Sequence, residues 1–105
     1  MIKNFLTKRG DQLAFTITFT AETPVSAMEF GVKERYSDDY YKILKFLGGG
    51  ITKISDYKYQ IVVSSEEMAK LDVKNYVYDL RMKIGTVIKT PLSGKLMIKD
   101  TVFEG

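Results

Sequence analysis

The chain has 105 residues, with 16 Lys or Arg against 13 Asp or Glu, so its formal net charge at pH 7 is +3. A chain of this length is expected to form one domain, here residues 1–105. Because the sequence contains no Cys and no His, it excludes disulfides, thiolate chemistry, and histidine as general base or zinc ligand. The basic residues are spread along the chain, and Lys8-Arg9 is the only adjacent basic pair, so no nucleic-acid partner is expected.

The sequence carries no pattern typical of a membrane span or of secretion. No apolar run approaches the roughly 20 residues that a membrane-spanning helix needs, so no membrane partner is expected. The N-terminal segment lacks the apolar stretch and the small-residue cleavage site of a signal peptide. The absence of Cys fits folding in a reducing cytosol.

Turn-forming residues recur at intervals of about ten residues, which is the spacing typical of a β-sandwich or barrel. The first strand is predicted at Ile2 to Lys8. The second is predicted at Leu13 to Phe19, where large apolar residues alternate with Ala and Thr. Pro24 ends this region because proline cannot donate to a strand ladder, and a third strand is predicted at residues 28–32.

The middle of the chain is less regular. Tyr40 to Leu47 is apolar on both sides of the alternation, which predicts a strand with a bulge or a strand covered on both faces, with a helix still open. Gly48, Gly49 and Gly50 follow, and glycines adopt positive φ angles at little steric cost. This glycine run is a candidate assembly loop.

The next elements are a strand pair and a short helical turn. Residues 51–56 are expected to form a short strand or an irregular segment, and residues 59–63 a further strand. Residues 64–71 break the period-two pattern: Ser64 or Ser65 can cap a helix, and two glutamates follow in its first turn. One or two helical turns crossing between sheets are therefore predicted here.

The last third of the chain predicts a long antiparallel hairpin. Residues 76–83 alternate apolar with mostly charged side chains, a turn follows at Gly85, and the return arm is interrupted near Pro91 to Gly94. The Pro and Gly indicate an edge strand or a bulge. With Lys95 and Lys99 blocking such an edge, the partner surface is expected at the end of the molecule that carries the glycine run. The predicted fold is all-β: an Ig-like antiparallel β-sandwich of about seven or eight strands with one short helical turn near 64–71.

The residues that could carry chemistry do not form a catalytic pattern. Asp38 and Asp39 are adjacent, and consecutive residues on an extended chain point apart. No calcium-loop spacing of acidic residues occurs, and the glycine run lacks the spacing and the strand-to-helix context of a phosphate-binding loop. We therefore expect no enzyme activity, no catalytic residues, no metal site and no cofactor.

Tyrosines near the middle loops are the main candidates for ligand contact. Tyr36, Tyr40, Tyr41 and Tyr57, with Tyr59 beside them, could stack on sugars and offer a hydroxyl. They could equally cover the sandwich edge or fill the core. They motivate an alternative function, a carbohydrate-binding β-sandwich that recognises cell-wall or surface glycans.

The order of several features along the chain resembles the N-terminal domain of phage baseplate upper proteins, a family of small β-sandwich modules in phages and prophages of Gram-positive bacteria. The resemblance covers most of the chain and rests on five features in order. The first two are Gly10-Asp11 before the strand at 13–19 and the segment Met68 to Leu71. The other three are the strand with Tyr76, Tyr78, Asp79 and Leu80, the pair Thr90 and Gly94 on the return arm, and the closing residues Leu96, Ile98, Asp100 and Thr101. Two departures are Gln12, where the family usually has Thr, and the Leu-poor segment Pro24-Val25-Ser26.

The resemblance implies a non-enzymatic virion component, associated with the baseplate or tail and synthesised in the bacterial cytoplasm. It implies partners among other virion or baseplate proteins, or further copies of this chain. The family brings no catalytic or cofactor residues, so none is carried over to this sequence.

Overall fold

The computed structural model describes residues 1–102, which form eight strands and one short helix. The elements are β1 (Phe5–Lys8), β2 (Leu13–Thr18), β3 (Ala27–Lys33), β4 (Ile43–Leu47), β5 (Gly50–Ser55), β6 (Lys58–Val63), α1 (Ser65–Met68), β7 (Asn75–Ile84) and β8 (Val87–Lys99). The predicted strands and the predicted helical turn are all present. The segment expected from Tyr40 to Leu47 becomes a strand only from Ile43 on, and its first residues belong to a loop.

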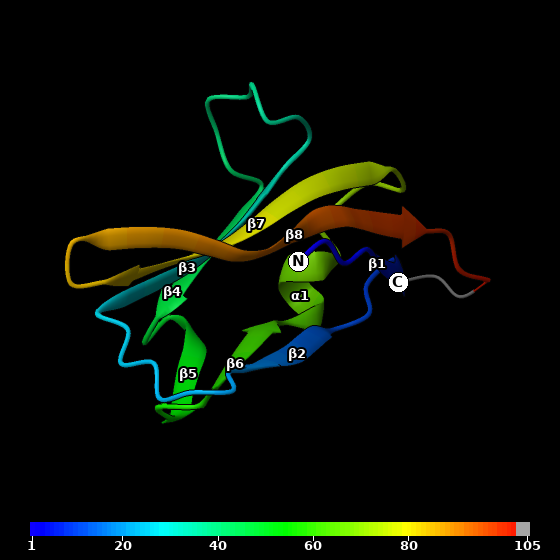
Figure 1. The fold of residues 1–105 in the computed structure, drawn as a ribbon. Helices are drawn as coiled ribbons and strands as arrows, with labels where there is room; N and C mark the ends of the chain where they lie inside the picture. Colours follow the sequence, from blue (N-terminus) through cyan, green and yellow to red (C-terminus); the bar gives the residue numbers. More distant parts are fainter. Residues whose placement is uncertain (103–105) are drawn as a thin grey trace.

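Hydrogen bonding connects the strands in the order β1-β8-β7-β3-β4-β5-β6-β2. Figure 1 shows that the chain bends between β4 and β5, so that β1, β8, β7, β3 and β4 form one layer and β5, β6 and β2 form the other. Neighbouring strands are antiparallel except for β1 with β8 and the short contact of β4 with β5. The predicted β-sandwich is confirmed.

The bend between the layers depends on the glycine run. Gly48 and Gly50 have φ angles of 90° and 101°, which residues that carry a Cβ rarely adopt. A Cβ on Gly49 would lie 2.6 Å from the ring of Phe46. The three glycines therefore serve the sharp crossover that carries the chain from one sheet to the other.

The core lies between the two layers and follows from the alternation in the sequence. In β7, inward residues Tyr76, Tyr78 and Met82 are buried, as predicted. The centre of the core is aromatic: the rings of Phe5, Phe15, Phe30 and Tyr78 contact one another with centroid separations of 4.8–5.6 Å. Immunoglobulin domains commonly place a disulfide and a Trp in this region, and this Cys-free chain fills it with aromatic rings.

The predicted helix cap is present at α1. The Ser64 side chain accepts a hydrogen bond from the Glu67 backbone N–H, and the Glu67 carboxylate accepts one from the Ser64 backbone N–H. This reciprocal pair is a capping box. A salt bridge from Lys45 of β4 to Glu67 ties the helix to the sheet, and Ser64 and Lys45 both lower the pKa of Glu67, Lys45 more strongly.

A tyrosine corner follows the helix at the start of β7. The Asp72 backbone N–H donates to the Tyr76 hydroxyl at 2.9 Å, and that hydroxyl donates back to the Asp72 carbonyl at 3.3 Å. The arrangement is a hallmark of immunoglobulin-type sandwiches, in which the loop before this strand is held by one tyrosine. It stabilises the turn between α1 and β7.

We expect Tyr76→Phe to lower the free energy of unfolding by about 1–2 kcal/mol, because it leaves two partly buried backbone groups of Asp72 without their partner. Urea denaturation followed by circular dichroism measures the change. Tyr57→Phe is the matched control, since its ring is half exposed in the β5–β6 turn. Equal stabilities of the Tyr76→Phe variant and the unsubstituted protein would contradict the role of the corner.

The return arm was predicted to be an edge strand or to carry a bulge, and the edge is wrong for the segment that carries Lys95 and Lys99. This end of β8 lies inside the sheet, because residues Phe5 to Lys8 of β1 pair in parallel with residues Leu96 to Lys99. The bulge that was predicted as the alternative is present: the register with β7 shifts opposite Arg81. The partner of Lys95 and Lys99 comes from the opposite end of the chain, and no local pattern in the arm shows it.

Candidate functional site

The outer face of the larger layer carries a shallow hollow of about 180 Å³. Its floor comes from the outward-facing residues of two central strands, because side chains alternate between the core and the outside along each strand. Those residues are Glu29, Gly31 and Lys33 of β3, and Val77, Asp79 and Arg81 of β7. The other lining residues are Tyr36, Tyr41, Leu44, Tyr78 and Thr90.

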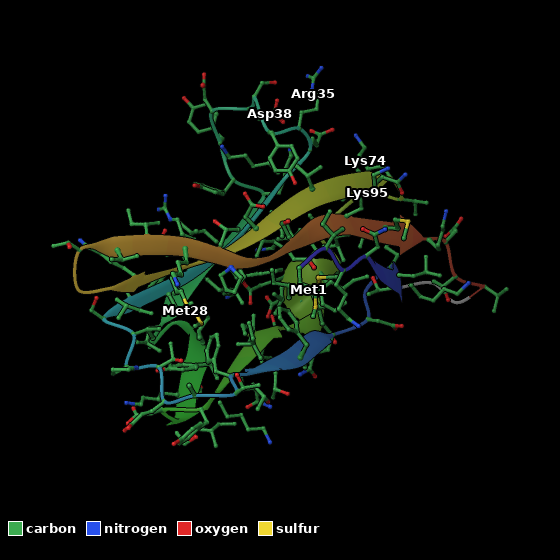
Figure 2. All side chains as sticks on the ribbon, in the orientation of Figure 1. Met1, Met28, Arg35, Asp38, Lys74 and Lys95 are labelled. Atoms are coloured by element: carbon green, nitrogen blue, oxygen red, sulfur yellow. The ribbon has the colours of Figure 1, made fainter. Side chains whose placement is uncertain are left out.

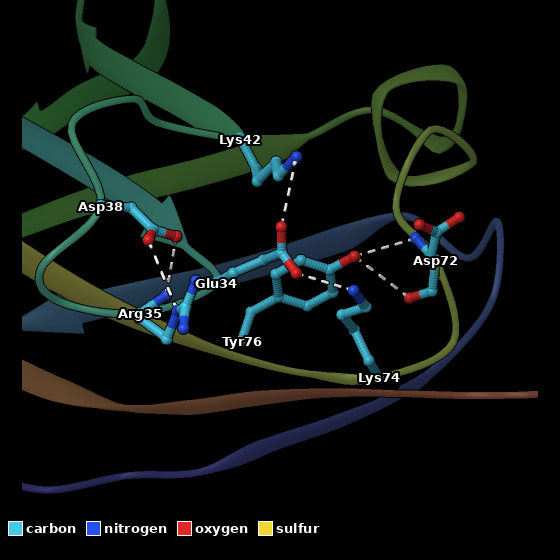
Figure 3. A network of polar contacts seen from close by, with 7 residues as sticks. All are labelled: Glu34, Arg35, Asp38, Lys42, Asp72, Lys74 and Tyr76. Carbon is cyan, nitrogen blue, oxygen red and sulfur yellow. Dashed lines mark hydrogen bonds and ion pairs between the residues drawn. The ribbon is translucent and has the colours of Figure 1, made fainter.

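The wall of the hollow is the β3–β4 loop, residues 34–42. Figure 3 shows that Glu34 joins this loop to β7: its carboxylate contacts Lys74 at 2.7 Å and Lys42 at 3.5 Å. These two ammonium groups, Lys74 above all, lower the pKa of Glu34. Both ends of the loop are thereby tied to the start of β7, next to the tyrosine corner.

The tip of the loop has its own turn. The Arg35 backbone N–H donates to the Asp38 carboxylate at 3.1 Å, and the Asp38 N–H donates to the Arg35 carbonyl at 3.1 Å. Figure 2 shows both side chains at the end of the loop, away from the sandwich. Asp38 thus holds the turn together.

Tyr41 is fixed against the sheet by two neighbours. A Cβ on Gly31 would lie 2.6 Å from the Tyr41 ring, so the ring packs directly on the glycine backbone. The Lys33 ammonium lies 4.7 Å from the ring centroid, a cation–π distance, and also donates to the Asp38 carbonyl at 2.8 Å. Gly31 therefore makes room for the tyrosine, while Lys33 links it to the loop.

The charged groups of the hollow balance one another. Glu29 and Asp79 carry negative charge, and Lys33 and Arg81 carry positive charge. Arg81 contacts Glu29 at 3.2 Å. Burial raises the pKa of the Asp79 carboxyl, and Lys33 opposes this shift only in part.

Two tyrosines respond to the same environment. Burial, and then the nearby Asp79 carboxylate, raise the pKa of Tyr36. Burial raises the pKa of Tyr78 to about 12, and its hydroxyl donates to the carbonyl of Lys3 in the N-terminal segment before β1. Neither phenol is therefore poised as an acid or base at neutral pH.

The tyrosines predicted as glycan contacts lie in different parts of the structure. Tyr36 and Tyr41 line the hollow together. Tyr40 is 85% exposed and does not line it, and Tyr57 lies in the β5–β6 turn at the opposite end of the molecule (Figure 1). Tyr59 is fully buried, and its hydroxyl donates to the Thr23 carbonyl at 3.0 Å. Tyr59 thus belongs to the core.

An apolar row continues from the hollow along β4. Leu44 and Phe46 point outward and are 42% and 55% exposed. The Phe46 ring also covers Gly49, so the row ends at the glycine run Gly48–Gly50. The role of that run as an assembly loop stays a prediction, while its role in the crossover is explained by the backbone.

Sequence reasoning did not identify the charged floor of the hollow. The alternation predicted that Glu29, Lys33, Asp79 and Arg81 face outward, but it could not show that β3 and β7 are neighbours. One signal was available: Gly31 interrupts a strand, and a glycine inside a strand often marks a close approach of another group.

Within residues 1–102, no group of three or more acidic side chains is placed to hold a metal ion. In the same range, no helix has the length and apolar character required to cross a membrane.

Comparisons with known proteins support the fold alone. No protein-family model and no curated protein matches the sequence. Among solved structures, the second Ig domain of the mouse polymeric immunoglobulin receptor is 8% identical, with a TM-score of 0.51 over 99% of this chain and 100% of that chain. The extracellular domain of the voltage-gated sodium channel beta4 subunit is 12% identical, with a TM-score of 0.52 over 96% and 93%. The NK cell receptor Nkp44 is 9% identical, with a TM-score of 0.52 over 96% and 99%. The chain therefore has an immunoglobulin-like β-sandwich fold.

Proposed function

We propose that this chain is a non-enzymatic component of a phage or prophage particle, in the baseplate or tail, and that it acts through protein–protein contacts. The partners are other virion proteins or further copies of the chain. The observation that carries the proposal is the outward apolar row of Leu44 and Phe46 on β4, which the described residues leave open to solvent.

Large apolar side chains that lie together on a protein surface mark interaction sites, because burying them against a partner removes them from water. Aromatic residues often dominate the energy of such interfaces. Phe46 has this character, and it is held in place by its contact with Gly49. Among the described residues, no helix covers the sheet face that carries it (Figure 1).

Two further observations support this assignment. The order of Tyr76, Tyr78, Asp79 and Leu80 before Thr90 and Gly94 resembles the phage baseplate family. The sodium channel beta4 subunit, which shares the fold, forms parallel homodimers through its extracellular domains, so a sandwich of this kind can present a contact face.

The test is incorporation into particles. We expect mass spectrometry of particles purified after prophage induction to find the protein at a constant ratio to a tail protein. A Phe46→Ser variant is expected to be lost from the particles, because a hydroxyl at the contact cannot replace the ring. Tyr57→Ser is the matched control, since this ring is similarly exposed but lies in the β5–β6 turn and not on β4.

Two outcomes would contradict the proposal. Absence of the unsubstituted protein from particles, with its presence in the lysate, would remove the virion role. Equal incorporation of the Phe46→Ser and unsubstituted proteins would show that β4 is not the contact surface.

A further inference from the structure

The hollow beside the β3–β4 loop is lined by charged side chains and a threonine hydroxyl, which an apolar interface does not require. We propose that it is a binding site for a neutral saccharide, taking one sugar ring against Tyr36 and Tyr41. The inference does not depend on the particle role: Leu44 belongs to both surfaces, but the proposed sugar contacts are made by Tyr36, Tyr41 and Asp79, which are not part of the apolar row of β4.

The aromatic side of the hollow suits a sugar ring. Tyr36 lines the hollow and is still 61% exposed, so its ring is available to a ligand. An aromatic face stacks on the C–H face of a sugar, and the phenol adds a hydrogen bond. Tyr41 is held by Gly31 and Lys33, so this wall is ordered before a ligand arrives, which lowers the entropy lost on binding.

The polar side of the hollow favours a ligand without charge. Its four charged residues are two acidic and two basic, namely Glu29, Asp79, Lys33 and Arg81. An ionic ligand would meet a like charge as well as an opposite one. A polyol can donate to the carboxylates and accept from the cations, and the Thr90 hydroxyl can do either.

Asp79 is the strongest candidate for a sugar contact. It faces outward from the middle of β7, where it is partly buried and lines the hollow, and this burial raises the pKa of its carboxyl. A hydrogen bond to a charged acceptor in such surroundings is stronger than one in water. Among the described residues, Asp79 forms no salt bridge.

The size of the hollow limits the ligand to one ring. Its volume of about 180 Å³ is below the roughly 300–1,000 Å³ of pockets that enclose drug-sized ligands. The fit is therefore to a terminal or side-branch sugar, with weak affinity for a single unit.

The experiment is an NMR titration of the ¹⁵N-labelled chain with the methyl glycosides of glucose, galactose and N-acetylglucosamine. We expect at least one of them to shift the amides of residues 31–44 and 77–81, with a Kd on the order of 1 mM. Added salt should leave that Kd unchanged, because the ligand carries no charge.

Three variants assign the binding to the hollow. Tyr36→Ala is expected to weaken it by about tenfold, a loss in the range of one aromatic contact. Asp79→Asn is expected to weaken it while keeping the shape of the side chain. Tyr57→Ala, the same change as in the first variant but at the other end of the molecule, should bind as the unsubstituted protein does, and thermal melts check that all three are folded.

The proposal is overturned if none of the three glycosides shifts an amide at about 20 mM, where a millimolar site would be largely occupied. It is also overturned if Tyr57→Ala weakens binding as much as Tyr36→Ala. Shifts of the same amides by a hexaproline peptide, with no response to the glycosides, would assign the hollow to a proline-rich segment instead.

Discussion

Phe30→Ala is expected to lower the free energy of unfolding by about 3–5 kcal/mol. The Phe30 side chain is fully buried at the centre of the sandwich. Its ring meets Phe15 at a centroid distance of 5.6 Å and Tyr78 at 5.5 Å, one partner from each layer. Truncation removes the apolar transfer energy and leaves a cavity between the layers, where the surrounding rings can close only in part.

A loss of this size is a large share of the roughly 5–15 kcal/mol of total stability typical of such domains. The measurement is urea denaturation followed by circular dichroism, with the m-value checked for constancy. Phe46→Ala is the control, because it removes the same ring from an exposed position on the neighbouring strand. If both substitutions lower the free energy of unfolding equally, the aromatic cluster is not the main source of stability in the core.

Gly94→Ala is expected to lower the free energy of unfolding by about 1–3 kcal/mol, the range for forcing extra atoms into a packed site. A Cβ on Gly94 would lie 2.2 Å from the carbonyl oxygen of Lys3. That carbonyl belongs to the backbone and accepts a hydrogen bond from the hydroxyl of Tyr78. The Lys3 N–H donates to the Ser93 carbonyl at 2.8 Å, so the N-terminal segment cannot retreat without losing hydrogen bonds.

Hydrogen exchange locates the effect of this substitution. In the Gly94→Ala variant, we expect the Lys3 amide to lose its protection before the amides of β3. Gly10→Ala is the control: Gly10 also has a positive φ, of 84°, but no atom lies within 4 Å of its added Cβ. Loss of Lys3 protection in both variants would mean that close packing at Gly94 is not the cause.

Local features of the fold could be predicted from the sequence. The alternation in β2 and β7 predicted which side chains are buried, because a strand places successive residues on opposite sides of the sheet. The capping box of Ser64 and Glu67 and the glycine turns are equally local, since each depends on residues within a few positions of one another. These features required no knowledge of neighbouring strands.

The position of β8 could not be predicted in this way. Its lysines suggested an edge, but the neighbour on that side is β1, about 90 residues earlier in the chain. Strand pairing over such a distance is decided by how the layers pack, and a residue pattern within one strand does not contain it. The same holds for Gly94, whose need for space arises from a segment at the other end of the sequence.

Composition and short-range periodicity were sufficient to predict the fold class, the buried face of each main strand and the lack of Cys and His chemistry. Which tyrosines could act together depended on how distant strands pack against one another. That packing placed Tyr36 and Tyr41 in one hollow with Asp79 and left Tyr57 at the far end. The hollow is assembled from β3, β4, β7, β8 and the β3–β4 loop, so its composition exists only once those segments are packed side by side.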